Sequence, residues 1–125
     1  MNKIFISIVF GTRPELIKLA PVILLAKQDP RFQVEVIFTG QHDELVRDAI
    51  DFFGVEIDHR LKIMNAGQSL NQLLIHGLSQ IENVYTDGQK RDAIVIQGDT
   101  TTVLASSLAA FYQKIKVIIM YLITQ

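Results

Sequence analysis

The sequence predicts an α/β fold, namely a Rossmann-like parallel sheet with helices on both faces, built from residues 1–125 as a single domain. Apolar runs of strand length alternate along the chain with helical patterns, as the crossovers between parallel strands require. The first run, residues 4–10, is apolar at nearly every position, which is typical of a strand covered on both faces. Two capping-box patterns, beginning at Thr12 and at Ser69, indicate where helices start.

The composition excludes several classes of protein. The chain is 49% hydrophobic, which supports one core, and its 125 residues are too few for two such domains. A net charge of -1, from 12 basic and 13 acidic side chains, provides no basic surface for nucleic acid. The absence of cysteine excludes disulfides and thiolate metal sites.

The apolar ends of the chain do not predict a membrane protein. Residues 117–123 form an apolar run far shorter than the roughly 20 residues of a membrane-spanning helix. The N-terminal apolar run leads directly into Gly11 and Thr12 without a small-residue cleavage site, so a buried strand explains it better than a signal peptide. We therefore expect a soluble, cytoplasmic protein with no membrane partner.

The first helix begins at a well-defined signal. Thr12 and Glu15 have the spacing of a capping box, in which each side chain binds a backbone N–H of the helix start. Pro14 falls in the first turn, where its missing N–H costs nothing. Pro21 is expected to bend the helix.

The later elements follow the same alternation. A strand over residues 33–39 precedes a helix over 43–53, and Gly54 suits the end of that helix. A weaker strand is predicted over 61–63, and Ser69 and Gln72 then form the second capping box. The remaining predicted elements are a helix to about Tyr85, a strand over 93–96, a helix over 103–112 capped by Thr100 or Thr101, and a strand over 117–123.

Right-handed crossovers favour the strand order 3-2-1-4-5. The first and fourth strands are then neighbours, and the helices that follow them leave to opposite faces of the sheet. This arrangement opens a crevice at the carboxyl ends of the strands, where such sheets bind ligands. Three polar loops are expected to converge there, at residues 11–13, 40–42 and 98–100.

Arg13 is the leading candidate for binding an anion. It stands at a helix N-terminus, where exposed N–H groups and the helix dipole favour negative charge. Its guanidinium also offers a fork of donors suited to phosphate. A surface arginine beside a capped helix explains this motif equally well, and the loop contains neither G-x-G-x-x-G nor a P-loop.

The other polar candidates each have a structural alternative. Lys18 extends either toward the crevice or into solvent. Asp99 is either a proton acceptor or a cap for the following helix. His42 either binds a ligand or is satisfied within its own loop, whereas His59 and His76 have no ligand set nearby and receive no metal or catalytic role.

Together these motifs resemble the non-hydrolysing UDP-N-acetylglucosamine 2-epimerases. The blocks that carry the resemblance are Phe10-Gly11-Thr12-Arg13-Pro14-Glu15, Thr39-Gly40-Gln41-His42, Ile63-Met64 with Gly67-Gln68-Ser69-Leu70, and Gln97-Gly98-Asp99-Thr100-Thr101-Thr102. They occur in the family's order over residues 4 to about 117, which is far more specific than any single block.

The resemblance implies a glycosyltransferase-B-like enzyme of two Rossmann-like domains, with the active site between them and a possible homodimer in the full-length family. The implied reaction inverts C2 of UDP-N-acetylglucosamine and gives UDP-N-acetylmannosamine for cell-envelope polysaccharide. UDP is eliminated to leave a 2-acetamidoglucal, and it is added back after reprotonation on the other face. No nicotinamide or catalytic metal is implied.

The resemblance also implies roles for individual residues. Arg13 stabilises the departing diphosphate, and Lys18 supports the same anionic pocket. Asp99 belongs to the acid/base group that acts at C2, and Thr100 is a substrate-binding residue in the same block. Residues implied to contact a second, activating UDP-sugar are Gln41, His42 and Gln68.

The end of the sequence departs from the family pattern. Where the family continues with a sequence like V-G-H-V-E-A-G-L-R-T, residues 116–125 read KVIIMYLITQ, and Tyr121 stands near the place of the catalytic Glu. We expect a truncated or frame-shifted product that carries the N-terminal domain, lacks the C-terminal nucleotide-binding domain and turns over negligibly. The downstream DNA, read in the other frames, tests this expectation. The alternatives are a stand-alone module that binds an anion or a partner, and a hydrolysing relative that releases UDP and free sugar.

Overall fold

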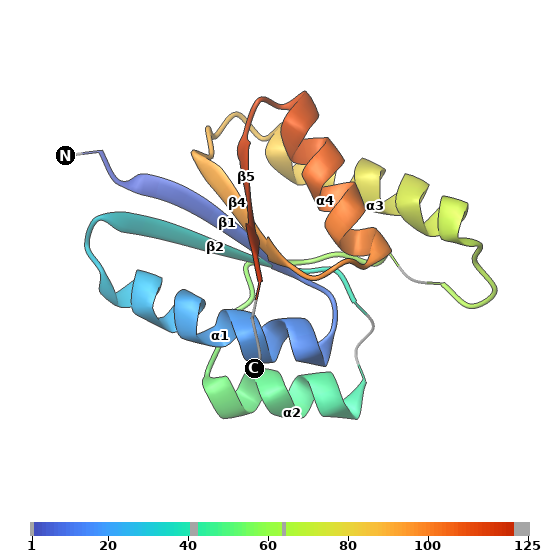
Figure 1. Cartoon of the computed structure of the whole chain (residues 1–125), viewed down its shortest axis with the longest axis horizontal. Helices are drawn as coiled ribbons and strands as arrows, with labels where there is room; N and C mark the ends of the chain where they lie inside the picture. The colour runs from blue at the N-terminus through green and yellow to red at the C-terminus, as the bar shows by residue number, and fades with distance from the viewer. Residues whose placement is uncertain (1, 41–42, 64, 122–125) are drawn as a thin grey trace.

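The computed structural model describes residues 2–40, 43–63 and 65–121 (Figure 1). Its elements are β1 (Ile4–Phe10), α1 (Arg13–Gln28), β2 (Phe32–Phe38), α2 (Glu44–Phe53), β3 (His59–Arg60), α3 (Leu70–Tyr85), β4 (Ala93–Gln97), α4 (Thr101–Tyr112) and β5 (Lys116–Met120). The strands form one five-stranded sheet in the order β3-β2-β1-β4-β5, and all neighbouring pairs are parallel. The predicted fold class and strand order are therefore confirmed.

Three layers are visible in Figure 1, where α1 and α2 cover one face of the sheet and α3 and α4 cover the other. Each face has its own apolar core. On the α1 side, the rings of Phe10 and Phe38 lie 5.1 Å apart, and both are buried. On the other side, Gly77 of α3 packs so closely on α4 that a Cβ there would lie 2.9 Å from Cβ of Ala105. No helix within the described ranges has the length and apolar character that crossing a bilayer demands.

The predicted helix starts are confirmed at atomic detail. Capping boxes are complete at Thr12 and at Ser69, and Thr100, one of the two predicted candidates, is the N-cap of α4. Gly54 ends α2 in the left-handed region, with φ of 66°, as expected of a C-terminal glycine. The helix α1 continues through Pro21 to Gln28, and the bend expected at this proline stays a prediction.

The third and fifth strands differ most from their predicted ranges. The third strand lies at His59–Arg60 instead of 61–63, because the chain joins β2 earlier, where the Asp58 carboxylate accepts from the Val36 amide at 2.8 Å. The apolar residue Ile63 is buried, but it lies beyond the paired segment. The last strand, β5, ends at Met120, and residues 122 and 123 of its predicted range lie outside the described residues.

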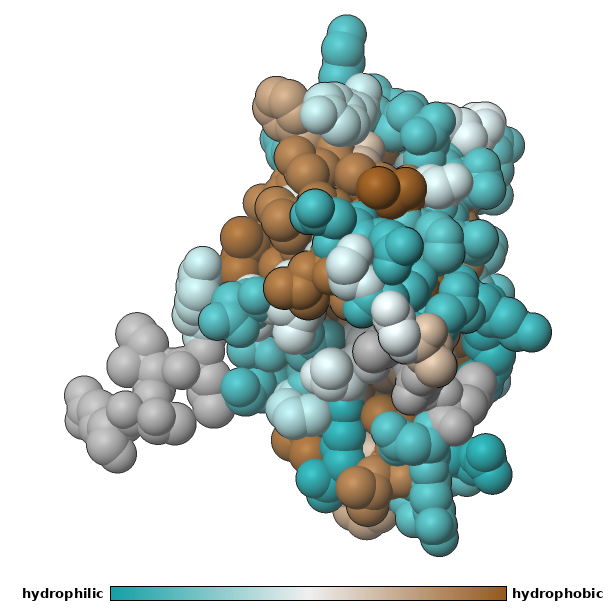
Figure 2. Space-filling view, turned by 90° about the vertical axis from the view of Figure 1, so that its right-hand side faces the viewer, coloured by the Kyte–Doolittle hydropathy of each residue, from teal (hydrophilic) through white to brown (hydrophobic). Residues whose placement is uncertain are grey.

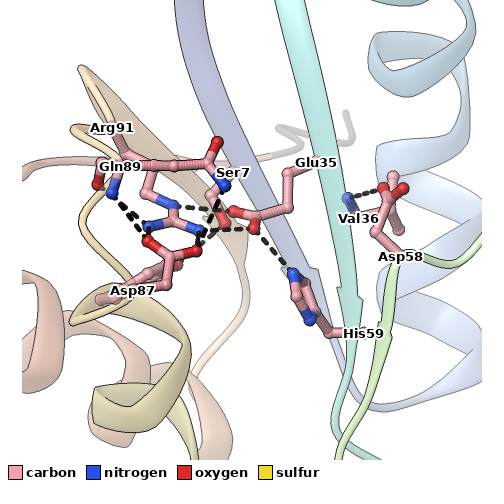
Figure 3. A network of polar contacts seen from close by, with 9 residues as sticks. Ser7, Glu35, Val36, Asp58, His59, Asp87, Gln89 and Arg91 are labelled. Carbon is pink, nitrogen blue, oxygen red and sulfur yellow. Dashed lines mark hydrogen bonds and ion pairs between the residues drawn. The ribbon is translucent and has the colours of Figure 1, made fainter.

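A charged cluster is buried on the α3 side of the sheet (Figure 3). The fully buried Arg91 donates to both carboxylate oxygens of Glu35 at 2.7 and 3.0 Å, and its side chain lies between the rings of Phe5 and Tyr85. It also donates to both oxygens of Asp87 at 2.7 and 2.9 Å. These bonds, together with one from the Gln89 amide, hold the pKa of the Asp87 carboxyl at about 2. The cluster joins β2 to the segment that leads into β4.

We predict that Arg91→Met lowers the free energy of unfolding by about 3 to 5 kcal/mol, because it leaves the Glu35 carboxylate buried without its cation. The double variant Glu35→Leu/Arg91→Met should recover the part of this loss that comes from the buried Glu35 carboxylate, whereas the partly exposed Asp87 still loses its partner. Urea unfolding followed by circular dichroism measures both.

The exposed neighbour Lys90 provides the control, and Lys90→Met should change stability by less than about 0.5 kcal/mol. A double variant as unstable as the single one would contradict the explanation by an unpaired buried charge.

Candidate active site

The loops that leave β1, β2 and β4 meet at the carboxyl end of the sheet, as the strand order predicts. A single buried carboxylate joins two of them. Oε1 of Glu15, on the first turn of α1, accepts from the amides of Gly11 at 2.8 Å and Thr12 at 3.2 Å. Its Oε2 accepts from the hydroxyl of Thr100, the N-cap of α4, at 3.0 Å. Glu15 is 4% exposed, and its partner Thr100 is half-buried.

The loop after β2 is joined to the loop after β1 by close backbone packing. The Thr39 amide donates to the carbonyl of Phe10 at 2.9 Å. A Cβ added to Gly40 would lie 1.8 Å from the carbonyl oxygen of Gly11, a distance that no side chain permits. Glycine is therefore required at position 40 so that the two backbones can approach each other.

Arg13 lies at the N-terminus of α1 and lines the space between α1 and α2. One hollow there, of about 300 Å³, is bordered by the first residues of both helices, including Thr12 and Asp43. A second, of about 470 Å³, is mostly apolar and includes Ile17 and Phe52. Within the described part of the chain the guanidinium of Arg13 makes no hydrogen bond or ion pair, and the residue is exposed.

The start of α1 offers fewer free hydrogen-bond donors to an anion than the sequence indicates. The amides of Gly11 and Thr12 already donate to Glu15, and the Glu15 amide donates to the Thr12 hydroxyl. The helix start thus carries its own anion, and backbone donors there are largely occupied. What remains for an external anion is the Arg13 side chain, because a carboxylate caps the start of α2 as well: Asp43 accepts from the Val46 amide at 2.8 Å.

Asp99 and Arg13 are brought into one loop cluster, each next to a residue bonded by Glu15. Arg13 follows Thr12, and Asp99 precedes Thr100. The Asp99 side chain is exposed, and it is not among the described residues that line the hollows beside Arg13. Convergence of the loops is therefore observed, whereas a hollow shared by both side chains stays a prediction.

The other candidates are placed less centrally. Lys18 is half-buried on α1. Gln68 lies before α3, where its amide group pairs with Nδ1 of His76 at 2.7 Å beside a polar hollow of about 310 Å³. Gln41 and His42 lie outside the described residues. Among the described residues no three His, Asp or Glu side chains form a group that could hold a metal ion.

Sequence reasoning missed the second contact of Glu15. The capping-box pattern predicts the local bonds to its own helix start, but it carries no signal for a partner 85 residues further on. The Arg91 cluster was missed as well, although Glu35 in the apolar run of β2 is a visible anomaly, since a carboxylate between buried strand residues requires a partner.

Comparison with known proteins identifies the family. The family model for UDP-N-acetylglucosamine 2-epimerase matches residues 25–120, well over half of the chain. The chain belongs to this family.

Individual epimerases resemble the chain closely in sequence and structure. The UDP-N-acetylglucosamine 2-epimerase of Salmonella borreze is 45% identical over 109 residues, which cover 87% of this chain and 29% of that protein. The crystal structure of UDP-GlcNAc 2-epimerase from Neisseria meningitidis bound to UDP-GlcNAc superposes with a TM-score of 0.85 at 41% identity, covering 93% of this chain and 32% of that one. A Methanocaldococcus jannaschii UDP-GlcNAc 2-epimerase in complex with UDP-GlcNAc and UDP gives 0.84 at 32% identity, with 93% and 32% covered. The chain thus spans less than a third of the epimerases it matches.

For this epimerase-family chain we predict that Gly40→Ala lowers the free energy of unfolding by about 3 kcal/mol, because a methyl group must push the Gly11 carbonyl away. Gly54→Ala is the comparison, since nothing lies within 4 Å of its new Cβ and only the left-handed backbone costs about 1 kcal/mol. Urea unfolding measures both variants, and equal losses would show that the loops after β1 and β2 are not in close contact.

Proposed function

We propose that this chain provides the first-domain side of a UDP-N-acetylglucosamine 2-epimerase site. The observation that carries the proposal is Arg13, an exposed guanidinium without a partner in the described chain, beside the N-termini of α1 and α2. This unpaired guanidinium offers a fork of donors that suits a diphosphate. Two family members of similar structure carry UDP-GlcNAc in their crystals, which supports the nucleotide sugar as the ligand.

The proposed reaction begins with elimination. A proton leaves C2 of the sugar while the bond between C1 and the diphosphate oxygen breaks, which gives UDP and a 2-acetamidoglucal. Arg13 stabilises the negative charge that develops on the departing diphosphate, and Lys18 adds a second cation on the same helix. Protonation of C2 on the opposite face and return of UDP to C1 complete the inversion.

Asp99 is proposed to take part in the proton transfers at C2. The exposed Asp99 side chain, just after β4, is accessible to a sugar, and Thr100 follows it in the proposed substrate-binding loop. Gln41, His42 and Gln68 are proposed to contact a second, activating nucleotide sugar. Gln68 and His76 already form a polar pair at the edge of an open hollow, which supports a role in ligand binding there.

A chimera tests the reaction, because the chain spans less than a third of its relatives. Residues 1–112 of this chain would replace the corresponding part of the Salmonella borreze epimerase, and NMR would follow deuterium entry at C2 of UDP-N-acetylglucosamine in heavy water. We expect exchange by the chimera. Asp99→Asn should slow it by about 100-fold or more, through loss of a proton acceptor, and Arg13→Ala by a similar factor, through loss of charge stabilisation.

The matched control is Arg31→Ala, an exposed arginine whose partner is Asp29 at the other end of the sheet, and it should leave the exchange rate unchanged. A folded chimera that exchanges no deuterium, while the parent enzyme does so, would refute the proposed function.

A second candidate function, a partner-binding module without catalysis, is favoured by the surface of β5. This edge strand exposes apolar side chains on both faces of the sheet, with Val117 36%, Ile118 48% and Ile119 40% exposed. Exposed Leu104 and Phe111 extend the apolar surface along α4, and Figure 2 shows apolar side chains gathered there, in the upper left of the view. An apolar edge strand favours pairing with another chain, and a second copy of β5 is the partner we propose for this function.

We predict that the chain self-associates and that Ile119→Lys weakens the association, because a charge on the edge strand opposes pairing. Light scattering coupled to size-exclusion chromatography measures the mass over about a hundredfold range of concentration. Ile75→Lys, at a 61% exposed apolar site on α3, serves as the control and should leave the mass unchanged. A monomer at every concentration would exclude self-association through β5.

A further inference from the structure

We propose that Glu15 is a positioning residue. It sets the distance between Arg13, which acts on the diphosphate, and Asp99, which acts at C2 of the sugar. The roles of Arg13 and Asp99 rest on the proposed function. The coupling of their two loops through Glu15 is a property of the chain itself. It assigns to Glu15 a task beyond capping its own helix.

The contacts of Glu15 exceed what a helix cap needs. A capping box is complete when the side chain at the third helical position binds the N-cap amide, and Oε1 of Glu15 alone does this for Thr12. The same oxygen also binds Gly11, and Oε2 reaches the loop after β4 through Thr100. A hydrogen bond to an ionised carboxylate in a buried place is stronger than one between neutral groups.

The second capping box of the chain shows the ordinary arrangement. Gln72 accepts from the Ser69 amide at 2.9 Å, and the Gln72 amide donates to the Ser69 hydroxyl at 3.1 Å. Both residues are exposed, and both bonds lie at the start of α3. Gln72 and Glu15 therefore occupy the same position in the same motif, but the hydrogen bonds described here for Gln72 stay within its own capping box.

The loop after β4 lies close to the carboxylate. Gly98 has φ of 98°, a conformation that favours glycine, and a Cβ there would lie 3.7 Å from Oε2 of Glu15. Thr100 is held from the other side, since its hydroxyl also accepts from the Val103 amide of α4. The carboxylate thus lies between the starts of two helices that cover opposite faces of the sheet.

This bridge determines the spacing of the proposed catalytic groups. Arg13 directly follows Thr12, and Asp99 directly precedes Thr100, so each is one residue from an atom bonded to Glu15. A displacement of about 1 Å between reacting groups is enough to cost about 100-fold in rate. A buried carboxylate that holds both loops prevents such a displacement.

Amide hydrogen exchange by NMR on the chain without ligand tests the coupling. Glu15→Ala should speed exchange by about tenfold at Gly11 and Thr12, which lose a direct bond, and also at Val103 and Leu104, in the first turn of α4. Glu15→Gln should restore slow exchange at both places, since its amide oxygen accepts from the first loop and its NH₂ donates to the Thr100 hydroxyl.

Gln72→Ala is the matched control, and its effect should stay at the start of α3. A variant of the partner residue keeps the test valid if Glu15→Ala does not fold. Thr100→Val should speed amide exchange at Thr12, on the other face of the sheet. Thr100→Ser, which keeps the hydroxyl, should not. The inference is overturned if Glu15→Ala leaves Val103 and Leu104 unchanged, or if it unfolds the chain and Thr100→Val leaves Thr12 unchanged. This experiment contains no nucleotide, so its failure would refute the coupling through Glu15. A chimera that exchanges no deuterium would instead refute the proposed function.

Discussion

The parallel pairing of β1 with both β2 and β4 is the constraint on which the candidate site depends. It brings three loops to the same end of the sheet, although Gly40 lies 29 residues and Gly98 lies 87 residues after Gly11 in the sequence. In parallel sheets of this kind, ligands bind at the carboxyl ends of the strands. The Glu15 carboxylate and the close approach of Gly40 to Gly11 then hold those loops together.

Arg91 and Arg13 use their charges in different ways, one within the fold and the other at the candidate site. Arg91 is fully buried, and Glu35, Asp87 and the Gln89 carbonyl accept its hydrogen bonds, so its charge is spent within the fold. Arg13 is exposed and without a partner in the described chain, so its charge is available to a ligand. A buried charge must be paired to be tolerated, whereas an unpaired surface cation costs little and attracts anions.

Much of the fold was predictable because its signals are local. Helix starts at Thr12, Ser69 and Thr100 follow from side chains that bind backbone amides three residues away, and the structure confirms each. The strand β3 was misplaced because two residues carry little periodicity, and pairing with β2 and the Asp58 contact decide its position. The loop motifs of the site were predictable from resemblance to the family, but the Glu15 bridge was not, because hydrogen bonds between distant residues leave no spacing rule in the sequence.

The sequence by itself determined the alternation of strands and helices, the sheet order and the family, because apolar periodicity, capping residues and contiguous motifs act over short stretches of chain. Tertiary structure alone decided that Glu15 faces Thr100, that the N-termini of α1 and α2 border one hollow, and that Arg91 is buried with Glu35. Those outcomes depend on the distances between elements in space. Packing of the two apolar cores sets these distances, and no local sequence pattern encodes them.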